Sequence, residues 1–157
     1  MSLASLSRKI GKALKAKGET LVTAESCTGG WVAQAVTSVV GSSDWFERGY
    51  VTYSNAAKQE LLGVRFQTLK RHGAVSEETA REMARGALRR GKGTLAIAIT
   101  GIAGPAGGAP GKPVGTVCFA WARGRKMRSE TRHFRGGRRT VRLRSVIHAM
   151  KGALKWL

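Results

Sequence analysis

The sequence predicts an α/β protein, a three-layer α/β/α sandwich with a mixed sheet. Segments with the apolar spacing of helices alternate with short segments rich in apolar and β-branched residues. Two strand-like segments, 114–122 and 127–134, then follow one another directly, joined by a turn near Gly124. Such a strand pair after alternating helices and strands makes a mixed sheet.

The first half of the chain begins with an amphipathic helix. Leu6, Ile10 and Leu14 recur at helical spacing, and Gly18 ends the segment. The next elements are predicted in this order: a strand over 20–24, a helix over 31–40, a strand over 49–53, and a helix that Ser54 or Asn55 caps and that ends at Leu62.

The second half contains the other main elements. Ser76 is predicted to cap a helix, because Glu77 and Glu78 follow it in the first turn, where carboxylates are favoured. A buried strand over 94–100 and a Gly/Pro-rich loop over 101–113 precede the strand pair. The last helix carries an apolar stripe, predicted to be core: Leu143, Ile147, Met150, Leu154 and Leu157.

Length and composition predict one domain over 1–157, because 157 residues with 42% hydrophobic content suffice for one core and not for two ordinary ones. No apolar segment has the length of a membrane span, and residues 1–18 lack the apolar centre of a signal peptide. We therefore expect a cytoplasmic protein without membrane contact. Cys27 and Cys118 have neither metal-site nor disulfide spacing, which favours two partly buried thiols.

Charge is the unusual bulk property. The chain has 28 Lys and Arg against 9 Asp and Glu, a formal net charge of +19, which favours anionic ligands. Ten of the basic residues lie in segment 122–144 beside a single acid, Glu130. This segment could be a nucleic-acid surface or a solvated face. The second interpretation is favoured, because no interleaved aromatic residues or nucleic-acid motif accompany the charge.

The sequence does not predict a metal site or a pair of catalytic carboxylates. Asp44 is the only aspartate, and His72, His133 and His148 are remote from one another and lack ligand spacing.

Three segments could carry chemistry, and residues 25–30 are the first. Ser26 lies between a strand and a helix and is followed by two glycines, so its hydroxyl could lie beside free N–H groups of Thr28, Gly29 and Gly30. Ser26 could equally be no more than a helix cap.

The second segment is 53–58, where Tyr53 ends a strand and Lys58 lies in the first turn of the next helix. The positive end of the helix dipole and partial burial both favour a neutral amine at Lys58, which a general base requires. Taken alone, this lysine could simply be solvated.

The third segment is the loop after the buried strand, which contains Thr100, Gly101 and Gly104. Ligands collect at the carboxyl ends of strands in α/β sheets, and a glycine-rich loop lets backbone amides approach a sugar or phosphate. The alternative is a flexible connection.

Five motifs together resemble one known family: Glu-Ser-Cys-Thr-Gly-Gly at 25–30, Tyr-Ser-Asn at 53–55 with Lys58, His-Gly-Ala-Val-Ser at 72–76, Gly-Ile-Ala-Gly-Pro at 101–105, and Lys-Pro-Val-Gly-Thr-Val at 112–117. They look like the C-terminal domain of the competence/damage-inducible protein CinA, whose stand-alone form is a nicotinamide-nucleotide amidase. The resemblance covers essentially the whole chain.

The resemblance implies hydrolysis of the carboxamide of nicotinamide mononucleotide to nicotinate mononucleotide and ammonia, in pyridine nucleotide salvage, without a metal or cofactor. It implies Ser26 as the nucleophile, Lys58 as its general base and Tyr53 as a hydroxyl that positions or relays the proton. The implied substrate contacts are Thr28, Gly29, Gly30, Asn55, Thr100, Gly101, Gly104 and Arg138. The amides of 28–30 could serve either the oxyanion or the phosphate.

Two positions depart from the family pattern. Gly137 replaces an acidic residue beside Arg138, and Ala106 stands where relatives often carry a polar residue. Neither departure affects the three implied catalytic residues, so we expect activity with weaker substrate binding. Two alternative functions stay open, a non-catalytic nucleotide-binding module and a basic nucleic-acid-associated protein. A homodimer also stays open.

Overall fold

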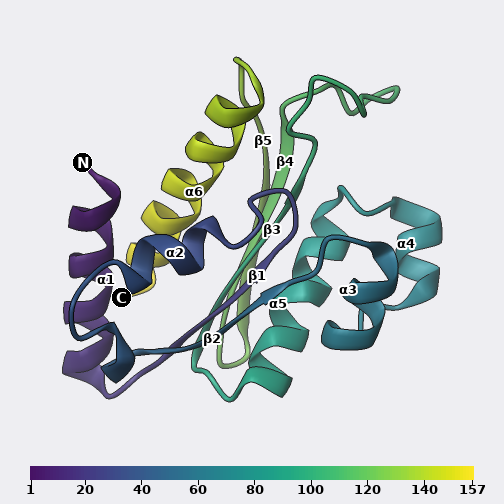
Figure 1. The fold of residues 1–157 in the computed structure, drawn as a ribbon. Coiled ribbons are helices and arrows are strands. Elements are labelled where there is room, and N and C mark those ends of the chain that lie inside the picture. The colour runs from purple at the N-terminus through teal and green to yellow at the C-terminus, as the bar shows by residue number, and fades with distance from the viewer.

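The computed structural model describes all of residues 1–157 and has one sheet between two helical layers (Figure 1). This confirms the predicted fold class. The helices are α1 (Leu3–Lys17), α2 (Trp31–Thr37), α3 (Asn55–Leu62), α4 (Phe66–His72), α5 (Glu77–Gly91) and α6 (Arg138–Leu154), with a short 3-10 turn, η1 (Ser42–Asp44). The strands are β1 (Leu21–Glu25), β2 (Phe46–Val51), β3 (Leu95–Gly101), β4 (Thr116–Arg123) and β5 (Lys126–His133).

The strand order is β2-β1-β3-β4-β5, and the sheet is mixed. β1 runs parallel to both β2 and β3, whereas β4 and β5 continue the sheet in antiparallel fashion. The carboxyl ends of the three parallel strands therefore meet at one edge. The segments that leave β1, β2 and β3 at this edge contain the three candidate functional segments of the sequence.

The two faces of the sheet differ in side-chain size. Along β3, Leu95, Ile97 and Ile99 belong to one core, while Ala96 and Ala98 belong to the other. β4 repeats the pattern, with Val, Phe and Trp on the first face and Cys and two Ala on the second. Because small side chains leave room for close approach, α5 packs directly on the second face, with α3 and α4 outside it (Figure 1).

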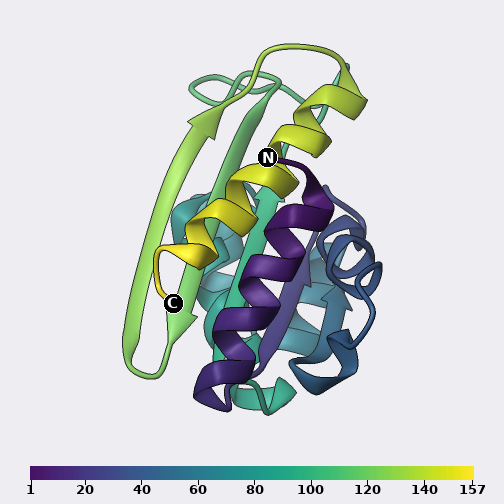
Figure 2. The ribbon, with the colours of Figure 1, turned by 90° about the vertical axis from the view of Figure 1, so that its left-hand side faces the viewer.

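The face with large side chains is covered by α1, α2 and α6 (Figure 1), and α1 and α6 lie next to each other across it (Figure 2). On α6 the fully buried residues include Val141, Ser145, Ala149 and Ala153. The predicted apolar stripe is thus only partly correct. Of the predicted stripe, Met150 is fully buried. Ile147, Leu154 and Leu157 are half-buried at the margin of the core, and Leu143 is also only partly buried.

The reason lies in one large residue of the sheet. Trp121 is fully buried, donates its indole N–H to the carbonyl of Ala149 at 2.8 Å, and lies so close to Gly152 that a Cβ there would be 2.2 Å from the ring. A helix that packs against a tryptophan must have small residues at the contact. A prediction from the spacing of large apolar residues does not detect them.

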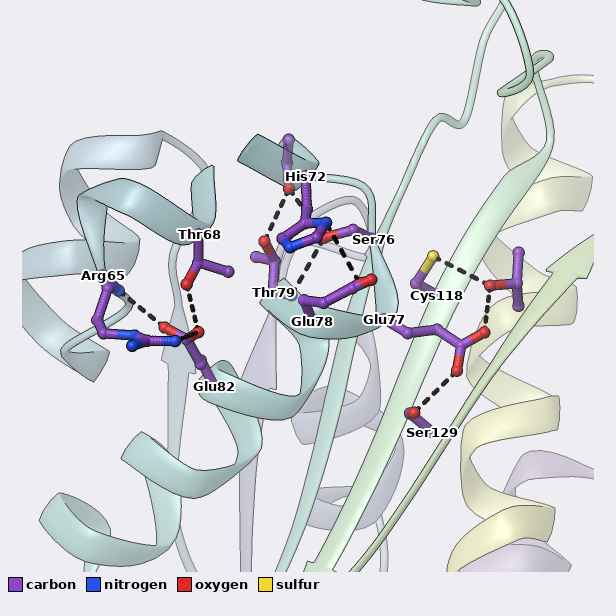
Figure 3. Close-up of polar contacts among 12 residues, drawn as sticks. Arg65, Thr68, His72, Ser76, Glu77, Glu78, Thr79, Glu82, Cys118 and Ser129 are labelled. Atoms are coloured by element: carbon purple, nitrogen blue, oxygen red, sulfur yellow. Dashed lines mark hydrogen bonds and ion pairs between the residues drawn. The ribbon is translucent and has the colours of Figure 1, made fainter. Parts of the chain in front are cut away.

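Three further differences from the sequence prediction are local. The helix predicted over 31–40 ends at Thr37, leaving Val40 fully exposed, and β2 begins at Phe46 and ends at Val51 instead of covering 49–53. Helix α4 was not predicted. Its first turn is held by Glu82 of α5, whose carboxylate accepts from the backbone N–H of Arg65 at 2.9 Å and from the Thr68 hydroxyl at 2.5 Å (Figure 3). A tertiary contact stabilises this helix.

The predicted caps are confirmed. Ser54 accepts from the N–H of Ala57 at 3.0 Å, and Ser76 accepts from the N–H of Thr79 at 3.1 Å (Figure 3). Glu77 does more than complement the α5 dipole: its carboxylate accepts hydrogen bonds from Ser129 and Thr131 of β5, each at 2.8 Å. The N-terminus of α5 is thereby fixed to the antiparallel end of the sheet.

Helix α3 rests on α5 at Gly86. A Cβ at this position would lie 1.8 Å from the carbonyl oxygen of Leu62, the last residue of α3. Since backbone atoms cannot rotate away as a side chain can, the absence of a Cβ sets the distance between the two helices.

We predict that Gly86→Ala lowers the free energy of unfolding by about 1–3 kcal/mol, the usual cost of overpacking. The gain of about 1 kcal/mol in helix propensity is too small to offset a backbone clash. Urea unfolding followed by circular dichroism measures the change. Gly137→Ala is the control, because Gly137 has an ordinary φ of −73° and nothing within 4 Å of the added carbon. Equal stability of Gly86→Ala and the wild type would contradict this packing argument.

Candidate active site

A cavity of about 260 Å³ opens at the carboxyl ends of β1 and β3. Ser26 and Lys58 line it together with parts of three loops, those after β2, before α5 and after β3. The segments after β1, β2 and β3 each contribute residues to the lining, so the structure joins the three segments that the sequence singled out.

The turn that carries Ser26 is held from both sides. The Ser26 N–H donates to the carbonyl of Ile99 on β3 at 2.9 Å, and the Ser26 carbonyl accepts from the N–H of Gly29 at 3.0 Å. Gly29 and Gly30 have φ values of 63° and 100°, the left-handed region that side chains rarely adopt. The two glycines therefore permit the tight turn that leads from β1 into α2.

Lys58 is the largest buried polar side chain, with 1% of its surface exposed. Its Nζ lies 3.0 Å from the Ser26 Oγ, 2.9 Å from the carbonyl oxygen of Thr52 and 3.2 Å from that of Tyr53. Burial lowers the pKa of Lys58 from its usual range. No carboxylate contacts the amine, and the one opposing influence, the charge of the Cys27 thiolate, is smaller than the effect of burial.

The three contacts can be made by both protonation states of the Lys58 amine. A neutral amine has two N–H donors and one lone pair. In the structure Nζ donates to the carbonyls of Thr52 and Tyr53 and to the Ser26 Oγ. When the amine is neutral, its two N–H groups serve the two carbonyls and its lone pair can accept the Ser26 hydroxyl proton. The arrangement can withdraw the proton from Ser26.

Glu25, directly before Ser26, occupies the N-terminus of α2. Its carboxylate is 1% exposed and accepts three hydrogen bonds: from the Thr28 hydroxyl at 2.6 Å, from the N–H of Val32 at 2.9 Å and from the N–H of Ala33 at 3.1 Å. The positive end of the helix is thus neutralised by the protein's own carboxylate. It is not free to hold a substrate anion.

The structure consequently does not bring four of the predicted contacts to the cavity. The Thr28 hydroxyl is used by Glu25 and the Gly29 N–H by Ser26, and neither they nor Gly30 line the cavity. Asn55 is exposed at the start of α3, and its side chain does not line the cavity either. The sequence argument assumed a free helix end, and the Glu25 cap removes it.

Arg138 and Tyr53 form the rim. Arg138 donates to the carbonyl of Gly104 at 2.9 Å and to the Tyr53 hydroxyl at 3.1 Å, so it connects the start of α6 with the loops after β2 and β3. The Tyr53 side chain is 62% exposed, and its hydroxyl has no hydrogen bond to Ser26 or Lys58. Its backbone carbonyl, not its hydroxyl, contacts Lys58 directly.

The remaining walls come from β3 and from the segment before α5. Thr100 is buried and donates its hydroxyl to the carbonyl of Ala74 at 2.8 Å, and Gly101 follows it in the wall. Ala74 and Val75 line the opposite side. Their position is fixed by the Gly73 carbonyl, which accepts from the hydroxyls of both capping-turn residues, Ser76 and Thr79 (Figure 3).

Two contributing residues were not identified from the sequence in these roles. Glu25 was quoted only as part of a motif, because it lies six residues before the first residue of α2, outside the positions of a usual helix cap. Arg142 donates to the carbonyls of Cys27 and Thr28, at 3.0 and 3.1 Å. No local signal predicts this contact, because the partners are more than a hundred residues apart.

Residues 3–157 match the CinA C-terminal domain. The chain belongs to this family. It is 53% identical to the nicotinamide-nucleotide amidohydrolase PncC of Escherichia coli K12 over 150 residues, which cover 95% of this chain and 91% of that protein. It is 48% identical to PncC of Pseudomonas putida, with 98% and 96% covered.

Solved structures of this family have the same fold. A competence damage-inducible protein A from Klebsiella pneumoniae superposes with a TM-score of 0.96 at 38% identity, covering 99% of this chain and 96% of that one. A competence/damage inducible protein from Agrobacterium tumefaciens gives 0.94 at 43% identity, with 99% of both chains covered.

No helix combines the length and the apolar character that crossing a membrane requires. No group of three or more His, Cys, Asp or Glu side chains could hold a metal ion.

Cys27, next to Ser26 in the cavity wall, allows a prediction. Burial raises the pKa of its thiol to about 12, so the reactive thiolate is almost absent at neutral pH. We expect iodoacetamide at pH 7.5 to label Cys27 at least about a hundredfold more slowly in the native protein than in the urea-unfolded protein, measured by mass spectrometry. The unfolded chain is the control for intrinsic reactivity. Rapid native labelling would instead favour the thiol as a second nucleophile.

Proposed function

We propose that this protein is a nicotinamide-nucleotide amidohydrolase, which converts nicotinamide mononucleotide to nicotinate mononucleotide and ammonia. The observation that carries the proposal is the 3.0 Å contact between the buried Lys58 amine and the Ser26 hydroxyl in a cavity. The identity of about half of all residues with two PncC amidohydrolases, over nearly the whole chain, supports the choice of substrate.

In the first half of the reaction, Lys58 takes the proton of the Ser26 hydroxyl while Oγ attacks the carboxamide carbon. The resulting Lys58 ammonium then gives a proton to the leaving amide nitrogen, and ammonia departs. An acyl ester on Ser26 remains. In the second half, water attacks the ester, Lys58 accepts its proton, and Ser26 regains its hydroxyl as the carboxylate is released.

The oxyanion that forms in each half-reaction requires donors. The helix end does not supply them, because Glu25 occupies it. The N–H of Cys27, the residue after the nucleophile, and the N–H groups of Ala103 and Gly104 make no backbone hydrogen bond and belong to residues that line the cavity. We assign the oxyanion to this set.

The size of the cavity indicates how the nucleotide binds. A cavity of about 260 Å³ is slightly below the usual lower limit of about 300 Å³ for ligand pockets, so it suits the pyridine carboxamide and not the whole nucleotide. The ribose and phosphate then extend to the rim, where Arg138 offers the phosphate a charge-assisted hydrogen bond. Thr100 and Gly101 contact the ring, and Tyr53 orients Arg138.

A non-catalytic nucleotide-binding module is the alternative at this site. It predicts saturable binding of nicotinamide mononucleotide without release of ammonia. A single assay with the purified protein, which follows both ammonia and nicotinate mononucleotide, distinguishes the two.

We predict that Ser26→Ala lowers kcat/KM by at least about 10³-fold and Lys58→Ala by about 10²–10⁴-fold, the usual contributions of a nucleophile and a general base. Lys58→Arg should be as inactive as Lys58→Ala, because an arginine keeps its proton. Lys70→Ala, which removes an exposed lysine from α4, is the control and should keep the wild-type rate. Full activity of Ser26→Ala or of Lys58→Arg would refute the mechanism.

The pH dependence follows from the direction of the Lys58 shift. The neutral amine is the active form, so kcat/KM should rise with pH as Lys58 loses its proton. Because burial lowers the pKa of Lys58, the midpoint of the rise should lie below about 10.4, the ordinary value for lysine. A pH series of initial rates measures it. A midpoint at or above the ordinary value would show that Lys58 does not titrate as a buried base.

A further inference from the structure

A second and larger cavity, of about 810 Å³, lies at the other end of the sheet. We call it the basal cavity. It is formed by the start of β3, the end of α5 and the turn between β4 and β5, which lie together at the bottom of Figure 1. β3 separates it from the Ser26 site by its seven residues, about 20 Å at 3.3 Å per residue.

The basal cavity gathers positive charge. Five of its lining residues are cations and one is an acid: Arg85, Arg89, Arg123, Arg125, Lys126 and Glu19. The acid is already used, because both oxygens of Glu19 accept from Arg123, at 3.0 and 2.6 Å. Arg85 donates to the carbonyl of Gly124 at 3.1 Å, which orients its guanidinium without neutralising it.

Three of these cations, Arg89, Arg125 and Lys126, form no ion pair or side-chain hydrogen bond within the chain. Arg89 lies in the last turn of α5, where a cation complements the helix dipole. The helix dipole does not explain the positions of Arg125 and Lys126, because these two residues lie at the turn between β4 and β5. Like charges repel at close range, so their convergence on one concavity is unfavourable until an anion enters.

Most of the other basic residues of segment 122–144 have partners. Arg132 pairs with Glu130, Arg128 lies over the ring of Trp121, and Arg142 holds the turn after β1. The segment therefore does not form one basic stripe. Its unpartnered charge is concentrated at the turn, which faces the basal cavity.

We propose that the basal cavity binds a compact polyanion that carries at least two adjacent phosphate groups. Five cations against one paired acid exceed what a single phosphate requires. A nucleic acid fits less well, because the cations surround a hollow instead of following a line and no aromatic side chain lines it for base stacking. This binding is independent of the amidohydrolase reaction proposed for the other end of the sheet.

The test is calorimetric titration of the full chain with inorganic tripolyphosphate at fixed ionic strength, compared with orthophosphate. We expect one site that binds tripolyphosphate at least about tenfold more tightly than orthophosphate. The triple variant Arg89→Gln, Arg125→Gln, Lys126→Gln should lose at least about tenfold in affinity, since each hydrogen bond to a charged group contributes about a factor of ten. Its unfolding temperature and its turnover of nicotinamide mononucleotide should stay at wild-type values.

The matched control removes the same charge from a helix surface: Arg8→Gln, Lys9→Gln, Lys12→Gln on α1, three exposed cations that also have no partner. It should bind tripolyphosphate within about twofold of the wild type. Equal losses in the two variants would mean diffuse attraction by net charge and would overturn the proposal. Tighter binding of a single-stranded oligodeoxythymidine than of tripolyphosphate, lost in the basal variant, would overturn it in favour of a nucleic-acid surface. Ser26→Ala should keep the site, which separates this proposal from the enzymatic one.

Discussion

The placement of one lysine amine in the protein interior is the constraint on which the rest of the structure depends. Lys58 has 1% of its surface exposed and meets only two carbonyls and one hydroxyl. A buried ammonium is costly, and the cost is relieved when the amine releases its proton. The same burial that lowers the stability of the protonated form therefore supplies a base where an exposed lysine would stay protonated.

Placing that amine requires the asymmetry of the sheet. Alanines of β3 and β4 allow α5 to lie directly on one face, and Gly86 allows α3 to lie directly on α5. These two close contacts bring the first turn of α3 to the carboxyl end of β1, where Ser26 lies. Larger side chains in place of these alanines or of Gly86 would move Lys58 away from Ser26 by ångströms. Proton transfer over the present distance of 3.0 Å would then no longer be possible.

The sequence was informative where chemistry depends on local order. Helix caps at Ser54 and Ser76 and the glycines after Ser26 are consequences of neighbouring residues, and they were predicted correctly. Helix α4 and the face of α6 were not, because Glu82 and Trp121, both distant in the chain, determine them. The contact between Ser26 and Lys58 was predicted only in part from local order. The position of Lys58 in the first turn of a helix predicted a lowered pKa, but the resemblance to the family, and not the spacing, paired this lysine with Ser26.

Glu25 stands beside Ser26, but its carboxylate does not contact Lys58. A free carboxylate near Lys58 would favour the ammonium and raise its pKa. Here the Glu25 carboxylate is directed to the start of α2, where two N–H groups and the Thr28 hydroxyl take up its charge. Apart from Lys58, the charged residue that lines the cavity is Arg138, a cation. The internal cap of α2 thus keeps the Glu25 carboxylate from opposing burial, which lowers the pKa of Lys58.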